Sequence, residues 1–243
     1  MKSFRIALIS LLLTAAFAYA AEPFAVQAWG NFKQMAHTGN TAGVVKVSEL
    51  GSAKGSYGLG AIAGMRGELL LWDGKMLVSR GHSTKGETGP ATATDEAVLF
   101  VRARVDAWQE MPVGKDMTQQ EFESFVVSTA KKAGLDTDKA FPFALRTSGM
   151  NLVWHVVTGA PSGGAHHGSG THQQGHANSR VFKEATVAGT LLGFYTAAAL
   201  EGIASHPGER FHVHYASADF SVSGHVDEYR VPRGSVLLLP KYK

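Results

Sequence analysis

Alternating apolar and polar positions predict a chain built largely from β-strands. The clearest segment is 67–79, GELLLWDGKMLVS, in which two apolar runs flank Asp73-Gly74, a dipeptide typical of a type I′ hairpin turn. The same alternation predicts strands at 98–105, 186–194, 210–216 and 224–231, and a strand pair formed by 141–149 and 152–159.

A helical period of apolar residues follows Thr118. Thr118 and Glu121 have the spacing of a capping box, and Gly134 is placed to end the helix. The stripe between them consists of Phe122, Phe125, Val126, Thr129, Ala130 and Ala133. A second helix is expected from Thr196 to about Ile203. This mixture predicts an α+β fold with extensive sheet.

One long segment, 161–180, has almost no apolar residues. Its sequence, PSGGAHHGSGTHQQGHANSR, is rich in Gly, Ser and His, so it buries little surface and is expected to be an exposed loop. We place an N-terminal lobe before it, at about 22–160, and a C-terminal lobe after it, at about 180–243. The histidines of this tract could bind metal without forming a defined site: His166, His167, His172 and His176.

The first twenty residues have the layout of a secretory signal peptide, with Lys2 and Arg5 before an apolar run that ends at Ala18 and Ala20. The alternative is a retained anchor, for which the run is short. Cleavage would leave a domain over 22–243 and remove two of the three net positive charges. We therefore expect a secreted or periplasmic protein without membrane contact after cleavage. The remaining charge gives no support for a nucleic-acid surface, and no nucleic-acid partner is expected.

The 243-residue chain contains no cysteine. Disulfide bonds and thiolate sites are therefore excluded. Any metal would have to be held by histidine, aspartate or glutamate side chains.

Three histidines near the C-terminus have a spacing that would bring them together on two paired β-strands. His212 and His214 are two residues apart, so they share one face of a strand. If the chain turns at Asp219 and Phe220, His214 lies opposite His225, with Cβ atoms about 5 Å apart. Three imidazoles with open coordination positions are typical of a catalytic zinc. The alternative is three solvated histidines on a polar face.

Other polar residues are candidates for the same chemistry. Asp227 shares a face with His225 and either orients a ligand or is a solvated acid. Glu68 begins an otherwise apolar strand and is either exposed at an edge or functional. Arg146 either forms a structural ion pair or binds an anionic substrate. His155 is interpreted as a core or edge histidine.

Several of these segments resemble the alpha-acetolactate decarboxylase family. The resemblance rests on the glycine-rich turn YGLGAIAGMRGELLLWDGK, on FALRTSG, and above all on the block at 187–231. That block carries G-T-L-L-G-F and then H-x-H-x10-H, and the histidine spacing is its specific feature. The likeness is patchy over about 25–140 and dense over 141–231.

The resemblance implies two β-rich lobes with mixed sheets and a metal site in the cleft between them. It implies that His212, His214 and His225 bind one zinc ion and that Glu68 and Arg146 are catalytic. The implied activity is that of a carbon–carbon lyase: zinc-dependent decarboxylation of 2-acetolactate, a small 2-hydroxy-3-oxo acid, to acetoin and CO2. A homodimer is compatible with it.

The sequence departs from the family pattern in three places. The histidine-rich loop replaces a T-R-T-x-P-R-Q-like stretch, Ser223 replaces the first glycine of G-G-H, and no acid follows Glu228 where relatives carry a late glutamate. Three alternatives stay open. They are a degenerate secreted protein that binds zinc or small acids, a decarboxylase of a related 2-hydroxy-3-oxo acid, and a periplasmic metal carrier that uses the histidine loop.

Overall fold

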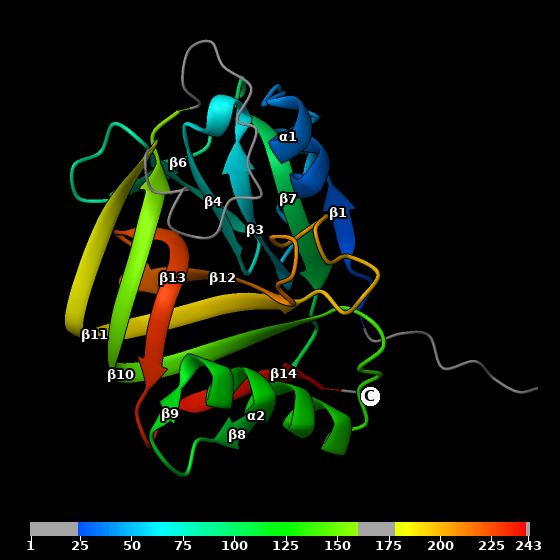
Figure 1. Cartoon of the computed structure of the whole chain (residues 1–243), viewed down its shortest axis with the longest axis vertical. Helices are drawn as coiled ribbons and strands as arrows, with labels where there is room; N and C mark the ends of the chain where they lie inside the picture. Colours follow the sequence, from blue (N-terminus) through cyan, green and yellow to red (C-terminus); the bar gives the residue numbers. More distant parts are fainter. Residues whose placement is uncertain (1–23, 160–177, 242–243) are drawn as a thin grey trace, which may run out of the picture.

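The protein consists of two sheets that follow one another along the sequence (Figure 1). The computed structural model describes residues 24–159 and 178–241. The strand order is β1-β7-β3-β4-β5-β6 in the first sheet, where β2 also pairs with β7, and β8-β14-β10-β11-β12-β13-β9 in the second. The predicted signal peptide and most of the histidine-rich loop lie outside the described residues.

All strand pairings among the described residues are antiparallel, so the prediction of mixed sheets is wrong. Parallel neighbours need a crossover of about a dozen or more residues, whereas tight turns join antiparallel ones. Short connections such as Asp73-Gly74 between β4 and β5 therefore favour antiparallel pairing.

The first sheet carries one short helix on its N-terminal side. Its strands are β1 (Gln27–Trp29), β2 (Val45–Lys46), β3 (Ser56–Ile62), β4 (Gly67–Trp72), β5 (Lys75–Arg80), β6 (Thr88–Pro90) and β7 (Glu96–Arg104). The helix is α1 (Phe32–Thr38), and the single 3-10 turns are η1 (Val47–Glu49) and η2 (Ala63–Met65). The predicted β4–β5 hairpin is confirmed: Asp73 and Gly74 have φ values of 47° and 84°, as a type I′ turn requires.

The second sheet contains all the strands after residue 104. They are β8 (Trp108–Pro112), β9 (Met117–Thr118), β10 (Phe141–Val157), β11 (Ser179–Tyr195), β12 (Phe211–Ser217), β13 (Ser223–Val231) and β14 (Val236–Pro240). The strands on either side of the histidine-rich loop, β10 and β11, pair with each other. The division between the sheets therefore falls between β7 and β8 rather than at that loop.

Two predicted elements differ from the structure. Segments 141–149 and 152–159 are not a strand pair but parts of one strand, β10, whose register shifts between Thr147 and Leu152. The predicted helix from Thr196 is a series of turns. Ala197 and Gly202 have φ values of 49° and 72°, which an α-helix does not contain.

Four strands of the second sheet form a closed ring of pairings. β10 pairs with both β11 and β13, and β12 pairs with β11 and β13 in turn. Large apolar side chains from these strands belong to the main core, among them Phe143, Trp154 and Tyr215.

The helix α2 (Gln119–Lys132) packs on this core. Its predicted capping box is present, and Phe122, Val126 and Ala130 are fully buried. Phe122 contacts Phe143 and Tyr229 at ring-centre distances of 6.3 Å and 6.0 Å.

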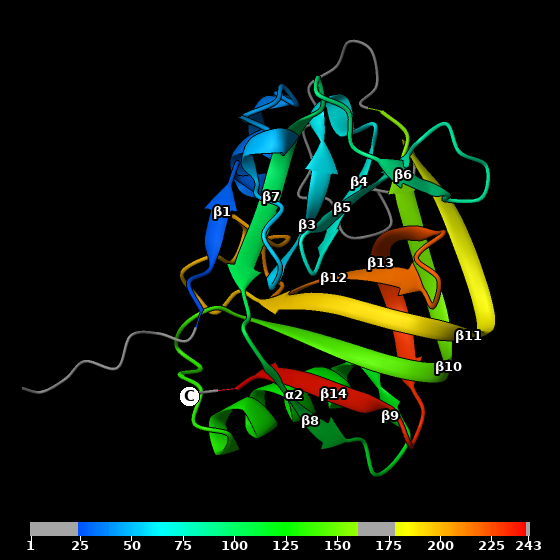
Figure 2. The same ribbon diagram turned by 180° about the vertical axis from the view of Figure 1, so that it is seen from behind.

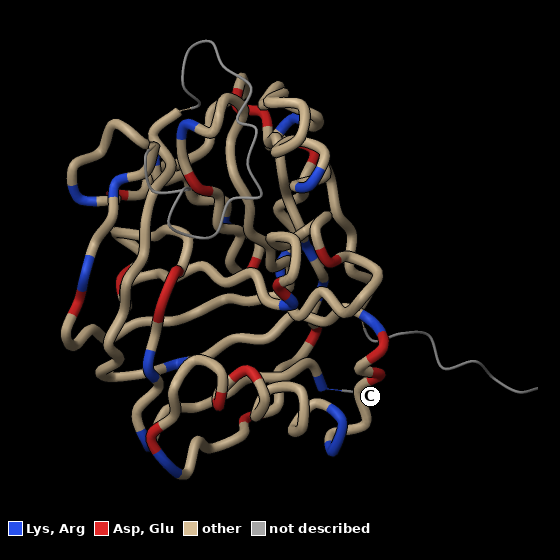
Figure 3. The backbone as a smooth tube through the Cα atoms, in the orientation of Figure 1, with Lys and Arg blue, Asp and Glu red and all other residues tan. Residues whose placement is uncertain are grey.

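The first sheet lies against one end of the second, and α2 covers the other end (Figure 2). Lysine, arginine and acidic residues are interspersed over both sheets (Figure 3). Among the described residues, the helices are too short or too polar to cross a bilayer.

Candidate metal centre

The β12–β13 hairpin brings three histidines together. His214 pairs directly with His225, which confirms the predicted register. One potential ligand nitrogen from each of His212, His214 and His225 lies within 4.8 Å of the others. The three rings are 5.0–5.4 Å apart, centre to centre. The turn between the strands is tied to the first sheet, because the amide of Thr88 donates to the carbonyl of Ser221 at 2.8 Å.

The protein fixes the orientation of the His212 ring. Its Nδ1 lies 2.7 Å from the carbonyl oxygen of Ala204. A carbonyl only accepts hydrogen bonds, so Nδ1 must carry the proton and Nε2 must carry the lone pair. This is the way in which metal-binding histidines are commonly held, with one nitrogen donating to the protein and the other available to a metal.

His214 lies in the interior, where neither ring nitrogen has a hydrogen-bond partner within 3.5 Å in good geometry among the described residues, although the backbone of Leu69 lies near the ring. The side chain is completely buried. Buried polar groups almost always have a partner, and an unsatisfied one destabilises the fold by about 1–3 kcal/mol. A metal ion within the histidine cluster would satisfy one of these nitrogens.

Burial also keeps the three histidines in the form that binds metal. Loss of solvation lowers the pKa of His212 to about 4. Desolvation likewise holds the pKa of His214 and of His225 well below the ordinary value. Since only neutral imidazole offers a lone pair, the site is ready for a cation at neutral pH.

Glu68 reaches this cluster from the first sheet. It is 3% exposed, and its Oε2 lies 3.7 Å from Nε2 of His214. Its Oε1 accepts a hydrogen bond from the amide of Val157 at 3.3 Å. Burial raises the pKa of Glu68 to about 7. Of the two predicted roles, edge exposure is thus excluded, and the carboxyl group lies against the histidines.

A second hydrogen bond joins the sheets beside Glu68. Ser79, the cross-strand neighbour of Glu68 on β5, contacts Ser223 on β13 through their hydroxyl oxygens at 2.9 Å. Both serines are fully buried. The neighbouring residues Glu68 and Ser79 therefore face the histidine hairpin.

Sequence reasoning gave little weight to two further histidines. His155 on β10 pairs with His225, and the two rings are 5.0 Å apart. Nδ1 of His155 lies 2.8 Å and 3.0 Å from the carboxylate oxygens of Asp227. Asp227 therefore holds His155, whereas the sequence predicted that it either orients a metal ligand or is a solvated acid. The signal that would have found this pair is the β10–β13 register, which links residues far apart in sequence.

His206 is the other missed histidine. It lies in the turns before β12, with its ring 5.7 Å from that of His225 and 4.1 Å from that of Phe32 at the start of α1. No periodic pattern marks such a position in the sequence.

Arg146 is not brought to this cluster. Its side chain is 52% exposed and forms an ion pair with Glu110 on β8. Its neighbours across the sheet are Thr190 and Val236. The described contacts thus bring the three predicted metal ligands and Glu68 together, whereas Arg146 forms an ion pair at the surface.

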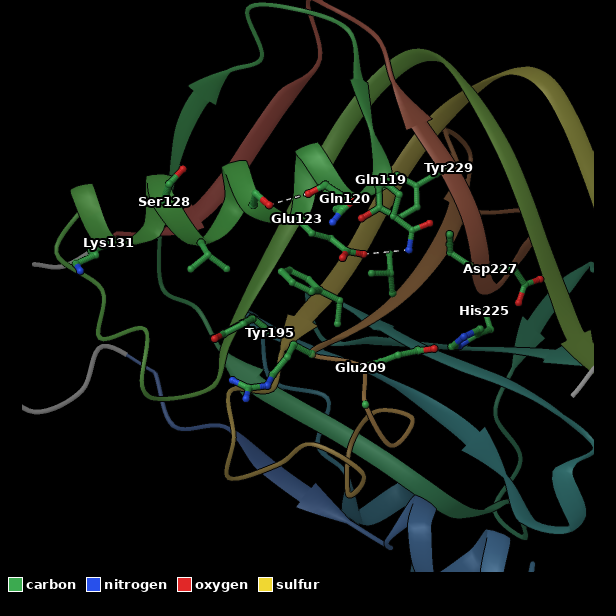
Figure 4. Close-up of a pocket in the computed structure, with 17 residues that line it drawn as sticks. Gln119, Gln120, Glu123, Ser128, Lys131, Tyr195, Glu209, His225, Asp227 and Tyr229 are labelled. Carbon is green, nitrogen blue, oxygen red and sulfur yellow. Dashed lines mark hydrogen bonds between the residues drawn. The ribbon is translucent and has the colours of Figure 1, made fainter. Parts of the chain in front are cut away.

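A pocket runs along α2, and its lining includes one member of the histidine cluster, His225 (Figure 4). It has a volume of about 820 Å³ and is lined at one end by His225 and Asp227. The wall formed by α2 includes Gln119 and Glu123. His212, His214 and Glu68 are not among its lining residues, so the pocket reaches only one edge of the cluster.

The residues present fit a single divalent metal ion with open positions. Three nitrogen ligands, one with its proton fixed on the far nitrogen and one buried without a partner, match the set expected for a catalytic zinc. Chemically, a cation beside a buried carboxyl group can stabilise negative charge on a substrate.

Known proteins resemble this chain over most of its length. Residues 31–240 match the family model described as alpha-acetolactate decarboxylase. Alpha-acetolactate decarboxylase of Lactococcus lactis subsp. cremoris is 25% identical over 197 residues, which cover 80% of this chain and 75% of that protein. The protein from Lactococcus lactis subsp. lactis is equally similar, with 25% identity and the same coverage.

Solved structures share the fold. The crystal structure of acetolactate decarboxylase from Bacillus subtilis subspecies spizizenii has a TM-score of 0.71 and 19% identity, and the match covers 89% of this chain and 86% of that one. A Staphylococcus aureus protein of unknown function similar to alpha-acetolactate decarboxylase gives 0.68 and 17%, with coverage of 88% and 84%. The match of the family model over residues 31–240 shows that the chain belongs to the alpha-acetolactate decarboxylase family.

Proposed function

We propose that the protein catalyses the zinc-dependent decarboxylation of 2-acetolactate to acetoin and CO2. The observation that carries this proposal is the convergence of three neutral histidines on a buried carboxyl group, Glu68, in a chain of this family. His212, His214 and His225 would hold the metal.

When bound, zinc would supply a Lewis acid that favours the negative charge formed on the substrate as CO2 leaves. In the reaction, the bond between C2 and the carboxylate carbon breaks, and its electron pair stays on the rest of the substrate. A proton must then be added to that carbon to give acetoin. The proton is finally replaced from solvent.

Glu68 would play one of two roles in the reaction. It lies within 4 Å of His214 and is held by the amide of Val157. As an acid it would deliver the proton to the new carbanion carbon, a contribution typically worth about 10²–10⁴-fold in rate. As a ligand it would complete the coordination of the metal. Arg146 was expected to bind the substrate, and its exposed pair with Glu110 gives that role no support.

The test combines metal content with acetoin production. His214→Ala should lose both the tightly bound zinc and acetoin formation, because the central ligand is removed. The matched control is His82→Ala, which removes an exposed histidine and should change neither. Undiminished acetoin release from His214→Ala would overturn the proposal.

A deletion separates this proposal from a metal carrier. A protein without residues 162–178 should keep one tightly bound zinc if the hairpin holds the metal. Loss of all bound zinc on this deletion would favour the carrier instead.

We also propose that a signal peptide directs export of the protein from the cytoplasm and is then removed. The basic and apolar N-terminal sequence supports this. Mass spectrometry of the protein from its native host should find a mature N-terminus at residue 21 or 22. An intact Met1 in the extracellular or periplasmic fraction would contradict cleavage.

A further inference from the structure

The segment between β11 and β12, residues 196–210, carries the carbonyl group that orients a metal ligand. The carbonyl oxygen of Ala204 accepts the proton on Nδ1 of His212 at 2.7 Å. The segment is a series of turns, so no regular helix or sheet ladder holds that carbonyl group in place. Its direction depends on the contacts that the segment makes with the rest of the protein.

The chain just before Ala204 is held by the helix α1, beside which the segment lies (Figure 1). The amide groups of Phe32 and Lys33, at the N-terminus of α1, donate to the carbonyl oxygens of Ile203 and Gly202 at 3.1 Å and 2.8 Å. The first amides of a helix have no partner within the helix, so these bonds satisfy both sides. One side of the Ala204 carbonyl group is therefore anchored to the N-terminal part of the protein.

Ser205 anchors the chain directly after Ala204. Its side chain is 2% exposed, and its hydroxyl group donates to the carbonyl oxygen of Glu209 at 2.6 Å. The hydroxyl oxygen of Thr196, a fully buried residue directly after β11, lies 3.3 Å away. Thr196 in turn donates to the carbonyl oxygen of Arg210, directly before β12, through its amide at 2.8 Å and its hydroxyl group at 3.2 Å. Ser205 thus ties the turn to the ends of two neighbouring strands.

The peptide group shared by Ala204 and Ser205 connects these anchors to the metal ligand. Because a peptide bond is planar, the carbonyl group of Ala204 turns together with the amide and Cα of Ser205. Loss of the side-chain bonds of Ser205 would therefore let that carbonyl group tilt away from Nδ1 of His212.

We propose that Ser205 is a positioning residue for the metal site. Through the carbonyl group of Ala204, it holds the ring of His212 in the orientation that presents Nε2 to a metal ion. Ser205 acts through His212 rather than by contact with the ion. The inference rests on the proposed function, because it takes His212 to be a zinc ligand.

The expected size of the effect follows from how metal-binding histidines depend on their outer partners. Loss of such a partner typically weakens metal binding by about 10–100-fold. Ser205 lies one step behind the direct partner of His212, so we expect the lower end of this range, about 10-fold.

The test compares two buried serines that have the same kind of contacts. Ser235, directly before β14, is 3% exposed, and its hydroxyl group lies 2.8 Å from the carbonyl oxygen of Pro232 and 3.0 Å from the hydroxyl oxygen of Thr147. Replacing either serine by alanine removes the same chemical group. Only the contacts of Ser205 lead to a metal ligand, so Ser235→Ala is the matched control.

Zinc affinity is measured on the full chain by competition with a chelator. Ser205→Ala should raise the zinc dissociation constant about 10-fold, whereas Ser235→Ala should change it by less than about twofold. Both variants should lower the urea midpoint of the metal-free protein, because each removes buried hydrogen bonds. Zinc affinity of Ser205→Ala equal to that of the parent, or an equal loss of affinity in both variants, would overturn the inference.

The orientation of His212 gives a second readout that needs no metal. In the parent, the proton on Nδ1 is held by the carbonyl group of Ala204, so it should exchange slowly and give a signal in histidine side-chain NMR spectra. The signal is assigned by its absence from His212→Gln. Ser205→Ala should abolish it through faster exchange, and Ser235→Ala should leave it in place. A signal that is unchanged in Ser205→Ala contradicts the inference.

A second variant keeps the test available if Ser205→Ala does not fold. Thr196→Val removes only the hydroxyl group that contacts Ser205 and keeps the shape of the side chain. It should raise the zinc dissociation constant about threefold, less than the loss of a direct partner of a histidine. An unchanged constant would then overturn the inference.

The outcomes distinguish this inference from the proposed function. If the parent protein binds no zinc tightly, the metal site of the proposed function fails. If the parent binds zinc and Ser205→Ala binds it equally well, the metal site stands and the role of Ser205 fails.

Discussion

His214 and Arg146 lie on the same face of the second sheet, but the first sheet covers only His214. Ala144, Leu192 and His214 are opposed across β10, β11 and β12, and Arg146 lies two residues further along β10, so all share a face. His214 is fully buried next to β4, whereas Arg146 is 52% exposed and pairs with Glu110, which is 61% exposed. His214 and Arg146 thus occupy similar positions in the second sheet. They differ because the first sheet covers His214 and leaves Arg146 open to solvent.

Coverage by the first sheet changes how strongly water competes for a polar side chain. At the open place, water competes with Glu110 for the guanidinium group, and an exposed ion pair adds only about 0–1 kcal/mol. At the covered place, water is removed from His214 and Glu68, so each charge or lone pair needs a partner supplied by the protein or a ligand. The contrast teaches that the water-free environment of His214 and Glu68 comes from the contact between the sheets.

The strongest test of this contrast is Glu68, the carboxyl group supplied by the covering sheet. Glu68→Gln should lower kcat by about 100-fold or more. Retained zinc with lost activity would assign the proton-transfer role, and lost zinc would assign the ligand role. Glu49→Gln, at an exposed position, is the control and should be neutral. Full activity of Glu68→Gln would remove the covering sheet from the chemistry.

In the metal-free protein, the pH dependence of the free energy of unfolding should reflect the protonation of the buried histidines. Between about pH 4 and 6.5 the unfolded chain binds a proton at His212 that the folded protein does not, because the folded pKa is about 4 against an ordinary 6.5. The free energy of unfolding should therefore rise with pH in this window. His214 and His225, with pKa values also lowered by burial, act in the same direction.

Glu68 acts in the opposite direction. Burial raises its pKa from 4.5 to about 7, so its contribution makes the free energy of unfolding fall as pH rises between these values. The opposite contribution of the three histidines is expected to be larger than that of this one carboxyl group. Urea unfolding with chelator at pH 4.5 and 6.5 measures the net slope, and His225→Asn should make it shallower. A slope that is unchanged in this variant would show that the histidines do not titrate as expected.

The hydrogen bond between Ser79 and Ser223, one of those that join the two sheets, gives a smaller effect. Ser79→Ala leaves the buried hydroxyl group of Ser223 without its partner and should lower the free energy of unfolding by about 1–3 kcal/mol. Adding Ser223→Ala to this variant should recover part of the loss, because both polar groups are then absent. Urea denaturation of the single and double variants checks this; equal stability of Ser79→Ala and the parent would mean that the bond is dispensable.

The smallest effect is expected at Arg146, which the first sheet does not cover. Arg146→Gln breaks only an exposed ion pair and should change the free energy of unfolding by no more than about 1 kcal/mol. Acetoin production should stay within about twofold of the parent. A large fall in kcat/KM would instead return Arg146 to the active site, as the family resemblance had implied.

Local patterns were sufficient for the elements with short-range signals. The Asp73-Gly74 turn and the Thr118–Glu121 capping box both follow from neighbouring residues. The pairing of His214 with His225 follows from strand alternation and a turn centred between them. The cluster was predictable because its members lie on one hairpin.

Long-range contacts were not predictable in the same way. The approach of Glu68 to His214 depends on how the two sheets pack, and the bond between His155 and Asp227 depends on β10 pairing with β13. The predicted helix from Thr196 failed because its apolar pattern does not reveal the positive φ of Ala197. Helix propensity is a weak signal that tertiary contacts override.

The closed ring of strands also constrains the order of folding. Its closure pairs Asn151–His155 of β10 with residues 225–230 of β13, about 70–80 positions later in the chain. Such distant pairings are slow, because the entropy of closing a long loop is lost before any contact forms. His225 lies both on the closing strand and on the hairpin that carries His212 and His214, so the three ligands can meet before the ring has shut. Metal uptake by the refolding chain would thus report formation of this hairpin rather than closure of the ring.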